Sequence, residues 1–183
     1  DFAGYSLIAL GLAKMLGIRL SLNFRAPYAA RSLREFWHRW HVTLSNWFRD
    51  YVYFPLGGSR GPFWALNLMI VFTVSGLWHG AGWNFVIWGA YHGVLLTVQR
   101  ALMRDGAQPE PSRPITEAVK WAGTYVLAMF GWLFFMETDW VQLTAKLRTL
   151  ADSASYSTSA AREVVSGFGS VDLAILGLAL LLA

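Results

Sequence analysis

The longest uncharged stretch of the sequence constrains the fold more than any other feature. The range Gly61–Gln99 contains 39 residues without Lys, Arg, Asp or Glu. A helix needs about 20 apolar residues to span a bilayer, so this stretch is nearly long enough for two. Gly80 and Gly82 interrupt it near the middle, and irregular backbone at membrane depth is tolerated where protein surrounds it. We therefore expect membrane-spanning helices at residues 63–79 and 83–99.

The composition also points to lipid as the solvent. Hydrophobic residues make up 55% of the 183 residues and charged residues 14%, whereas a soluble domain carries about 25% charged residues. Eight basic but only two acidic residues lie between Lys14 and Arg60, which places this region near the cytoplasmic face under the positive-inside rule. In so apolar a chain, these basic residues do not indicate nucleic-acid binding. The absence of cysteine excludes disulfides, thiolate metal sites and cysteine nucleophiles.

Three further apolar segments complete the predicted topology. They are residues 1–20, 115–136 and 171–183. The last segment is shorter than a full span, and the first residue is Asp1 rather than methionine. We therefore expect residues 1–183 to be part of a single membrane domain that continues beyond both ends. The predicted fold class is all-α, a multi-spanning transmembrane helical bundle.

A strongly amphipathic segment precedes the uncharged stretch. Ser32 and Glu35 have the spacing of a capping box, which predicts the start of a helix. Aromatic and leucine side chains then recur at helical spacing as far as Tyr51, while arginines lie away from this stripe. Lipid cannot surround a helix with so polar a face. We expect residues 32–51 to form one amphipathic segment whose helix covers about residues 33–51. This helix is expected to be interfacial or re-entrant and to face water.

Histidines in apolar surroundings are the candidates for chemistry. His79 is flanked by glycines that leave room for a substrate, and an ionisable residue at membrane depth indicates function by default. His41 lies at the border between the aromatic stripe and the polar face, where a side chain meets both packing and water. His92 has less local support, and His38 lies well inside the polar face, as a solvated residue does. Packing is the alternative explanation for His79 and His41.

Several kinds of reactive site are absent from the sequence. The histidines have no carboxylate companions at metal-binding spacing, so we expect no metal site. The serine elbow G-x-S-x-G is missing, as is an aspartate five residues after any histidine. What remains is an imidazole that acts as a general base, since neutral imidazole takes a proton from a hydroxyl group near pH 7.

Two blocks of sequence carry a family resemblance. They are FRAPYAARSLREFWHRWHVTLSNWFRDYVYFPLGG (residues 24–58) and SGLWHGAGWNFVIWGAYHG (residues 75–93). Together they resemble the membrane-bound O-acyltransferase family, and the match is best to its bacterial branch of alginate O-acetyltransferase and related polysaccharide acetylation proteins. The resemblance covers about residues 1–100 strongly. It implies a funnel-like helical bundle in the bacterial inner membrane, with several passes.

The resemblance also implies an activity and its residues. The expected enzyme is an acyltransferase that moves an acetyl group from a cytoplasmic thioester to a hydroxyl group of an exported, alginate-like polysaccharide. His79 corresponds to the catalytic histidine of the family, and His41 to a second catalytic-site residue. The further residues that we expect to contact substrates are Trp78, Asn84, Trp40 and His92.

The expected ligands and partners follow from the same resemblance. The donor is acetyl-CoA or an acyl-carrier thioester, which binds as a substrate, and no cofactor is bound permanently. Partners are membrane lipid, the polysaccharide acceptor and periplasmic proteins that finish the acetylation. Direct transfer and an acyl-histidine relay both remain open. The alternative functions are a transporter or channel component and a non-catalytic subunit of a polysaccharide export complex.

Overall fold

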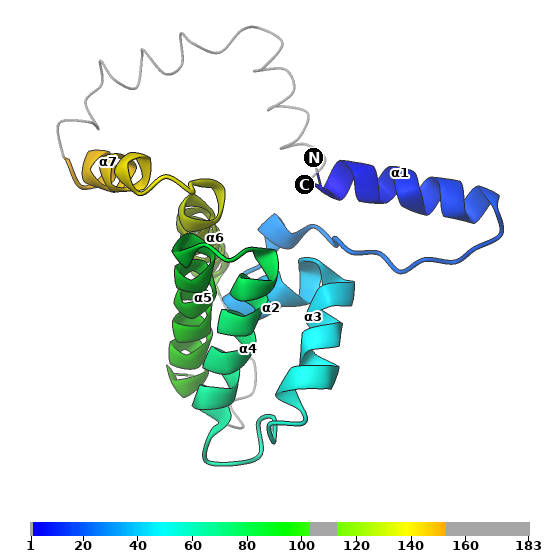
Figure 1. Ribbon diagram of the computed structural model, residues 1–183, viewed down its shortest axis with the longest axis horizontal. Coiled ribbons are helices and arrows are strands. Elements are labelled where there is room, and N and C mark those ends of the chain that lie inside the picture. The colour runs from blue at the N-terminus through cyan, green and yellow to red at the C-terminus, as the bar shows by residue number, and fades with distance from the viewer. Residues whose placement is uncertain (1, 103–112, 153–183) are drawn as a thin grey trace, which may run out of the picture. The chain divides into compact units, whose positions relative to one another are not determined.

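The described part of the chain is entirely helical in its regular structure. The computed structural model describes residues 2–102 and 113–152, and these ranges contain α-helices, one 3-10 helix and one π-helix (Figure 1). The prediction of an all-α fold is confirmed for these residues. The chain divides into two compact units, Asp1–Phe135 and Met136–Ala183. The expected span at residues 171–183 lies outside the described residues.

Two antiparallel helices form the centre of the first unit. Helix α4 (Trp64–His79) and helix α5 (Trp83–Leu102) lie side by side, joined by a short turn at Gly80–Gly82 (Figure 1). A Cβ atom at Gly76 would lie 2.2 Å from the carbonyl oxygen of Phe85. The backbones of the two helices are therefore in direct contact, which only glycine permits. The predicted interruption near Gly80 is confirmed.

Helix α6 (Pro114–Met136) runs antiparallel to α5. The Tyr91 hydroxyl donates to the carbonyl oxygen of Leu127 at 2.9 Å, and the Asn84 amide donates to that of Phe134 at 3.2 Å. Among the described helices, α6 alone has both the length and the hydropathy needed to cross a membrane. Helix α1 (Phe2–Met15) and helix α4 are apolar but shorter, and α1 ends before residue 20, where we expected the first span to end.

The prediction of one continuous helix over residues 32–51 is wrong. The segment forms α2 (Leu33–Arg39), α3 (Val42–Phe48) and a π-helix, η2 (Arg49–Tyr53), and it is interrupted at Trp40 and His41. Trp40 has an extended backbone and His41 is left-handed, with φ 44° and ψ 55°. The chain therefore changes direction where a regular helix was expected.

A distant loop causes this interruption. The Val42 amide donates to the carbonyl oxygen of Asn23 at 3.0 Å, and the Arg39 carbonyl accepts from the Arg25 amide at 3.0 Å. The Thr43 amide donates to Asn23 Oδ1 at 3.1 Å. These bonds replace some of the ones that a helix would make across residues 39–43.

The start of α2 follows the predicted capping pattern. The Ser32 hydroxyl oxygen accepts from the Glu35 amide at 3.1 Å. The Glu35 carboxylate in turn accepts from the Arg31 amide at 2.8 Å. This hydrogen bond is the main reason that the pKa of Glu35 is lowered, with the nearby arginine guanidiniums adding to the effect. The capping box is therefore present, with its return bond one residue before the usual position.

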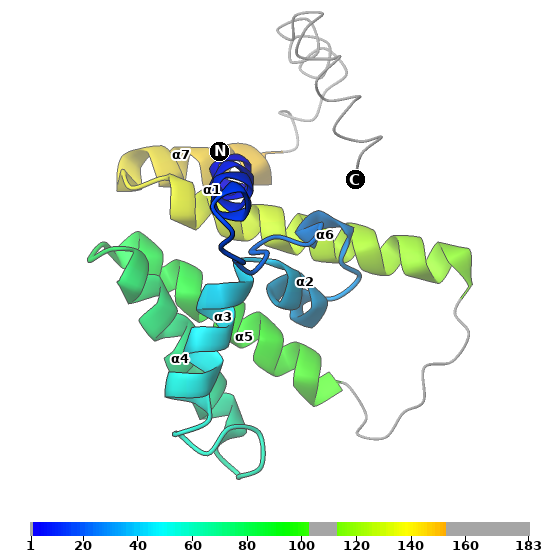
Figure 2. The same ribbon diagram turned by 90° about the vertical axis from the view of Figure 1, so that its right-hand side faces the viewer.

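The buried face of α2 packs against α6 and the 3-10 helix η1 (Pro27–Ala29), as Figure 2 shows. Ala30, Phe36 and Ala128 are almost fully buried there, each about 1% exposed. The partly buried indoles that surround them are those of Trp37, Trp40 and Trp132. Burying large aromatic side chains supplies most of the packing energy of such a cluster.

Basic residues gather at one end of the three long helices. Arg60 precedes α4, Lys120 lies in the first turns of α6, and Arg100 lies in the last turn of α5. Arg100 donates to the Tyr53 hydroxyl and the Ser59 carbonyl oxygen, and its guanidinium lies 4.6 Å from the centre of the Trp64 ring. Because α5 runs antiparallel to α4 and α6, His79 lies at the opposite end.

The second unit contains helix α7 (Trp140–Ala151). The Asp139 carboxylate caps its start by accepting from the Val141 amide at 2.7 Å and the Gln142 amide at 3.3 Å. Glu137 forms an ion pair with Lys146, and the pKa of the Glu137 carboxyl is lowered mainly by this contact.

Candidate active site

His79 is the last residue of α4, and aromatic rings surround its imidazole. The ring centre lies 4.9 Å from those of Trp78 and Phe135 and 5.3 Å from that of Trp88, and all three contacts are edge-on. The imidazole is partly buried, and it makes no hydrogen bond to another residue in the described parts of the chain. Both ring nitrogens therefore remain available to a substrate.

Glycine is required beside this histidine. A Cβ atom at Gly80 would lie 2.4 Å from the ring of Phe85. The helix ends there because Gly80 has an extended backbone, with φ 166° and ψ 161°. The turn can thus pass close to the aromatic rings while the imidazole stays at the end of its helix.

His41 lies at the interruption between α2 and α3. Left-handed backbone at a residue other than glycine is uncommon and is enriched at functional sites. The imidazole packs against the ring of Phe2, with centres 4.8 Å apart, and its Nδ1 atom is buried without a hydrogen-bond partner in the described residues. Burial lowers the pKa of the His41 imidazole below its ordinary value of 6.5. The side chain is therefore neutral at pH 7.

One predicted catalytic histidine lines a cavity, and the other directly follows a residue that lines it. His41 and Trp78 both line a cavity of about 690 Å³, which is bounded mainly by α1 and residues 19–24. His79 follows Trp78 directly in the chain, and its imidazole is close enough to that of His41 for the two to interact electrostatically. The structure thus brings together residues that are 38 positions apart in the sequence.

His92 occupies a different position, in the middle of α5. It is 1% exposed, and its imidazole packs against Trp37 and Trp88 with ring centres 5.0 and 5.3 Å away. A Cβ atom at Gly131 would lie 2.5 Å from its Nε2 atom, so α6 closes over it. The ring of Trp88 contacts the imidazoles of both His92 and His79.

Three tryptophans with buried indole nitrogens lie beside these histidines, and the sequence did not single them out. They come from three helices: Trp37 from α2, Trp88 from α5 and Trp132 from α6. The indole Nε1 of each is buried and has no hydrogen-bond partner among the described residues. Trp88 lies 5.7 Å from Trp37 and 6.1 Å from Trp132, measured between ring centres. Buried donors without a partner are rare, so this aromatic cluster is a candidate for binding an oxygen atom of a substrate.

The remaining predicted site residues have separate environments. Trp78 is 59% exposed at the end of α4. Asn84 is buried, and its amide is used to hold the start of α5 against the end of α6 through Phe134. Trp40 lies 4.7 Å from Trp132 between ring centres, which connects the interruption at His41 to the aromatic cluster.

The sequence as a whole matches a known family. The sequence model of the membrane-bound O-acyltransferase family matches residues 1–140, which include His41, His79 and His92. The chain belongs to this family. Members of this family are membrane proteins, and the relatives of this chain include acyltransferases.

Individual relatives agree with this assignment. The chain is 47% identical over 137 residues to the probable alginate O-acetylase AlgI of Azotobacter vinelandii, and 40% identical over 137 residues to the peptidoglycan O-acetyltransferase of Helicobacter pylori. It is 33% identical over 155 residues to the teichoic acid D-alanyltransferase of Streptococcus thermophilus. Each match covers 74% of this chain. The chain spans 26% of the length of the first two relatives and 37% of the third.

Proposed function

We propose that this chain carries the reaction centre of a membrane-embedded O-acetyltransferase with a polysaccharide acceptor. An acetyl group passes from a thioester donor, acetyl-CoA or an acyl-carrier thioester, to a hydroxyl group of an exported, alginate-like polymer. Among the relatives, identity is higher to the alginate O-acetylase, at 47%, than to the peptidoglycan and teichoic acid enzymes. This order favours an alginate-like acceptor.

The observation that carries the proposal is the position of His79. Its imidazole stands at the end of a helix with no competing hydrogen bond in the described residues, and it directly follows Trp78, which lines the cavity that His41 also lines. The rings of Trp88 and Phe135 contact the imidazole edge-on. A base in such a setting is oriented toward a substrate rather than toward another side chain.

The reaction follows from this arrangement. His79 takes the proton from the acceptor hydroxyl group, and the hydroxyl oxygen attacks the carbonyl carbon of the thioester. The carbon–sulfur bond then breaks, and the leaving thiolate takes up the proton from the imidazolium. The products are an O-acetyl ester and a free thiol, so no oxidant, reductant or bound cofactor is needed.

The neighbouring groups have supporting roles in this proposal. Negative charge develops on the thioester oxygen during attack, and preorganised N–H donors stabilise such charge. The indole N–H groups of Trp37, Trp88 and Trp132 are donors of this kind that no described residue occupies. His41, kept neutral by burial, is the second histidine beside the cavity and orients the acceptor or relays its proton.

The distribution of charge supports access from two sides. Basic residues mark the end of α4, α5 and α6 that carries Arg60, Arg100 and Lys120, which the positive-inside rule assigns to the cytoplasm. His79 lies at the other end of α4, toward the outer side. We place the complete protein in the bacterial inner membrane as a multi-spanning bundle, with the polymer and its periplasmic partner proteins on the outer side.

Membranes that carry the complete protein provide the test. Acetyl transfer from a labelled thioester to polysaccharide is measured for wild type, His79→Gln and Gln142→Ala, an exposed control on α7. Loss of a general base lowers the rate by about 10²–10⁴-fold, and we expect this loss for His79→Gln alone. Normal transfer by an equally abundant His79→Gln protein contradicts the assignment of the base. Solute flux without any transfer by wild type supports the transporter class instead.

A further inference from the structure

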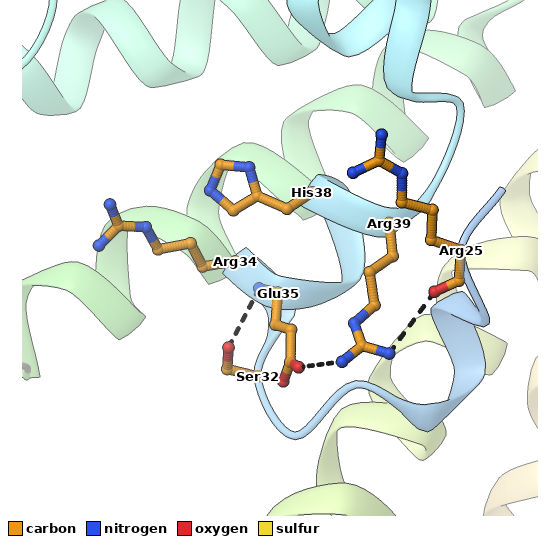
Figure 3. A pocket seen from close by; sticks show the side chains of 6 residues that line it. All are labelled: Arg25, Ser32, Arg34, Glu35, His38 and Arg39. Atoms are coloured by element: carbon orange, nitrogen blue, oxygen red, sulfur yellow. Dashed lines mark hydrogen bonds and ion pairs between the residues drawn. The ribbon is translucent and has the colours of Figure 1, made fainter. Parts of the chain in front are cut away.

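A second pocket lies on the polar side of α2, away from the aromatic cluster. Its volume is about 500 Å³, and Figure 3 shows its lining side chains. The residues that line it are Arg25, Ser32, Arg34, Glu35, His38 and Arg39. Every lining residue is polar or charged, and none belongs to the candidate active site. The pocket therefore needs an explanation of its own.

The pocket carries an excess of positive charge that the protein itself does not neutralise. The Arg39 guanidinium is already bound within the protein, because it donates to the Glu35 carboxylate at 2.6 Å and to the carbonyl oxygens of Arg25 and Ala26. The side chains of Arg25 and Arg34 make no hydrogen bond or ion pair with another described residue, and in Figure 3 both extend away from Glu35, with the His38 imidazole between them. The lining of the pocket thus contains three guanidiniums and a single carboxylate.

The position of the pocket identifies the kind of anion. Arg31, two residues before α2, forms an ion pair at 2.7 Å with Glu117, which lies in the first turn of the membrane-spanning candidate α6. One turn further along α6, the Trp121 indole donates to the carbonyl oxygen of Tyr28 at 2.8 Å. Trp121 is 44% exposed and Tyr28 is 39% exposed. Exposed tryptophan and tyrosine beside the polar end of a spanning helix are typical of the level of the lipid headgroups.

The surface next to the pocket is suited to acyl chains. Arg25 and Ser32 line the pocket, and Tyr28, which lies between them in the sequence, contacts α6. On α6 the partly exposed ring of Tyr125 stacks against Trp121 and contacts the ring of Tyr28. An aromatic surface of α6, against which acyl chains can pack, therefore lies beside the segment that carries Arg25 and Ser32.

We propose that this pocket binds the phosphate headgroup of an anionic phospholipid. Guanidinium groups pair with phosphate through two parallel hydrogen bonds, and basic pockets beside spanning helices on the cytoplasmic side bind acidic lipids. Arg25 and Arg34 supply the guanidiniums that are free to pair with the phosphate. The ion pair with Glu35 holds the Arg39 guanidinium in the pocket wall. The site is independent of the acetyl-transfer chemistry.

The experiment uses the complete protein in phosphatidylcholine nanodiscs with and without phosphatidylglycerol. Native mass spectrometry counts the lipids that stay bound to wild type, to Arg25→Gln/Arg34→Gln and to Arg60→Gln/Arg148→Gln, a control with the same change in charge. Each basic residue near a membrane surface contributes about a fivefold change in affinity for acidic lipid, so we expect the first variant to bind phosphatidylglycerol about 30-fold more weakly. The control removes two charges outside the pocket and should weaken binding much less than the first variant does.

Two further measurements keep the test decisive. Arg25→Lys/Arg34→Lys preserves the charge and should retain most of the binding, which separates lost charge from lost folding. Coenzyme A is added as a soluble phosphate ester. If it displaces phosphatidylglycerol from wild type, and its own binding is lost in Arg25→Gln/Arg34→Gln, the pocket belongs to the acyl donor and the lipid assignment is wrong. Equal losses in both double variants, or no preference for phosphatidylglycerol, also overturn it.

Discussion

The contact between α4 and α5 depends on glycine, so one methyl group should disturb it. In Gly89→Ala the new Cβ atom would lie 2.2 Å from the carbonyl oxygen of Phe72 and 3.1 Å from the Cα atom of Thr73, whereas ordinary contacts begin near 3.4 Å. Both neighbours are backbone atoms, which cannot rotate away. One helix must therefore move by about 1 Å.

The expected cost can be worked out from this clash. Overpacking a tight contact costs about 1–3 kcal/mol, while replacing a helical glycine by alanine gains up to about 1 kcal/mol in helix propensity. We expect Gly89→Ala to lose about 1–2 kcal/mol of stability on balance. A displacement of about 1 Å near reacting groups can cost about 10²-fold in rate, and Trp88, next to Gly89, contacts His79.

Two other glycines provide the controls. A Cβ atom at Gly123 in α6 meets nothing within 4 Å, so Gly123→Ala should be neutral or slightly stabilising. A Cβ atom at Gly93 would lie 2.9 Å from the sulfur of Met69, a flexible side chain, so Gly93→Ala should be milder and should be relieved by Met69→Ala. Thermal unfolding and acetyl transfer of the complete protein are measured for each variant. If Gly89→Ala matches Gly123→Ala, or if Met69→Ala rescues it, the reasoning is refuted.

Two further predictions concern a loop and a histidine. Asn67→Ala removes donors to the carbonyl oxygens of Leu56 at 3.0 Å and Gly58 at 3.1 Å, and should lower the free energy of unfolding by about 2 kcal/mol, whereas a variant of exposed Asn46 should change it by less than about 0.5 kcal/mol. His41 has a folded-state pKa below its unfolded value of 6.5, so protonation favours the unfolded chain, and the stability present above pH 6.5 is lost as the pH falls below it. Asparagine tolerates left-handed backbone, so His41→Asn keeps the local conformation but removes the imidazole. The melting temperature of this variant should therefore fall less between neutral and acidic pH than that of wild type. Equal falls would contradict the burial of a neutral imidazole.

Local signals in the sequence located several elements correctly. Gly80 and Gly82 mark the turn between α4 and α5, and Ser32 with Glu35 marks the start of α2. The apolar segment at 115–136 corresponds closely to α6. Each of these signals acts over a few residues, through backbone freedom, capping or continuous hydrophobicity, so a single sequence is enough to identify it.

The sequence did not predict features that depend on distant contacts. The aromatic periodicity across residues 33–51 is helical, and nothing near His41 indicates an interruption, because the competing backbone partners are Asn23 and Arg25. The aromatic cluster was missed for the same reason: Trp37, Trp88 and Trp132 come from three helices and meet only in the folded chain. The spacing of Trp88 and His92, one helical turn apart in the uncharged part of α5, was a clue in the sequence.

The interruption at His41 has a consequence for how this region tolerates change. Main-chain atoms of Asn23, Arg25 and Arg39 supply two of the hydrogen bonds that hold it, so any side chain other than proline at residue 25 or 39 leaves the donors and acceptors of those bonds in place. A scan of single replacements at these two positions should leave the histidine in place. Inserting or deleting one residue between positions 19 and 25 would instead slide the donors and acceptors out of alignment. The position of this imidazole thus depends on the length of the loop more than on the side chains in it.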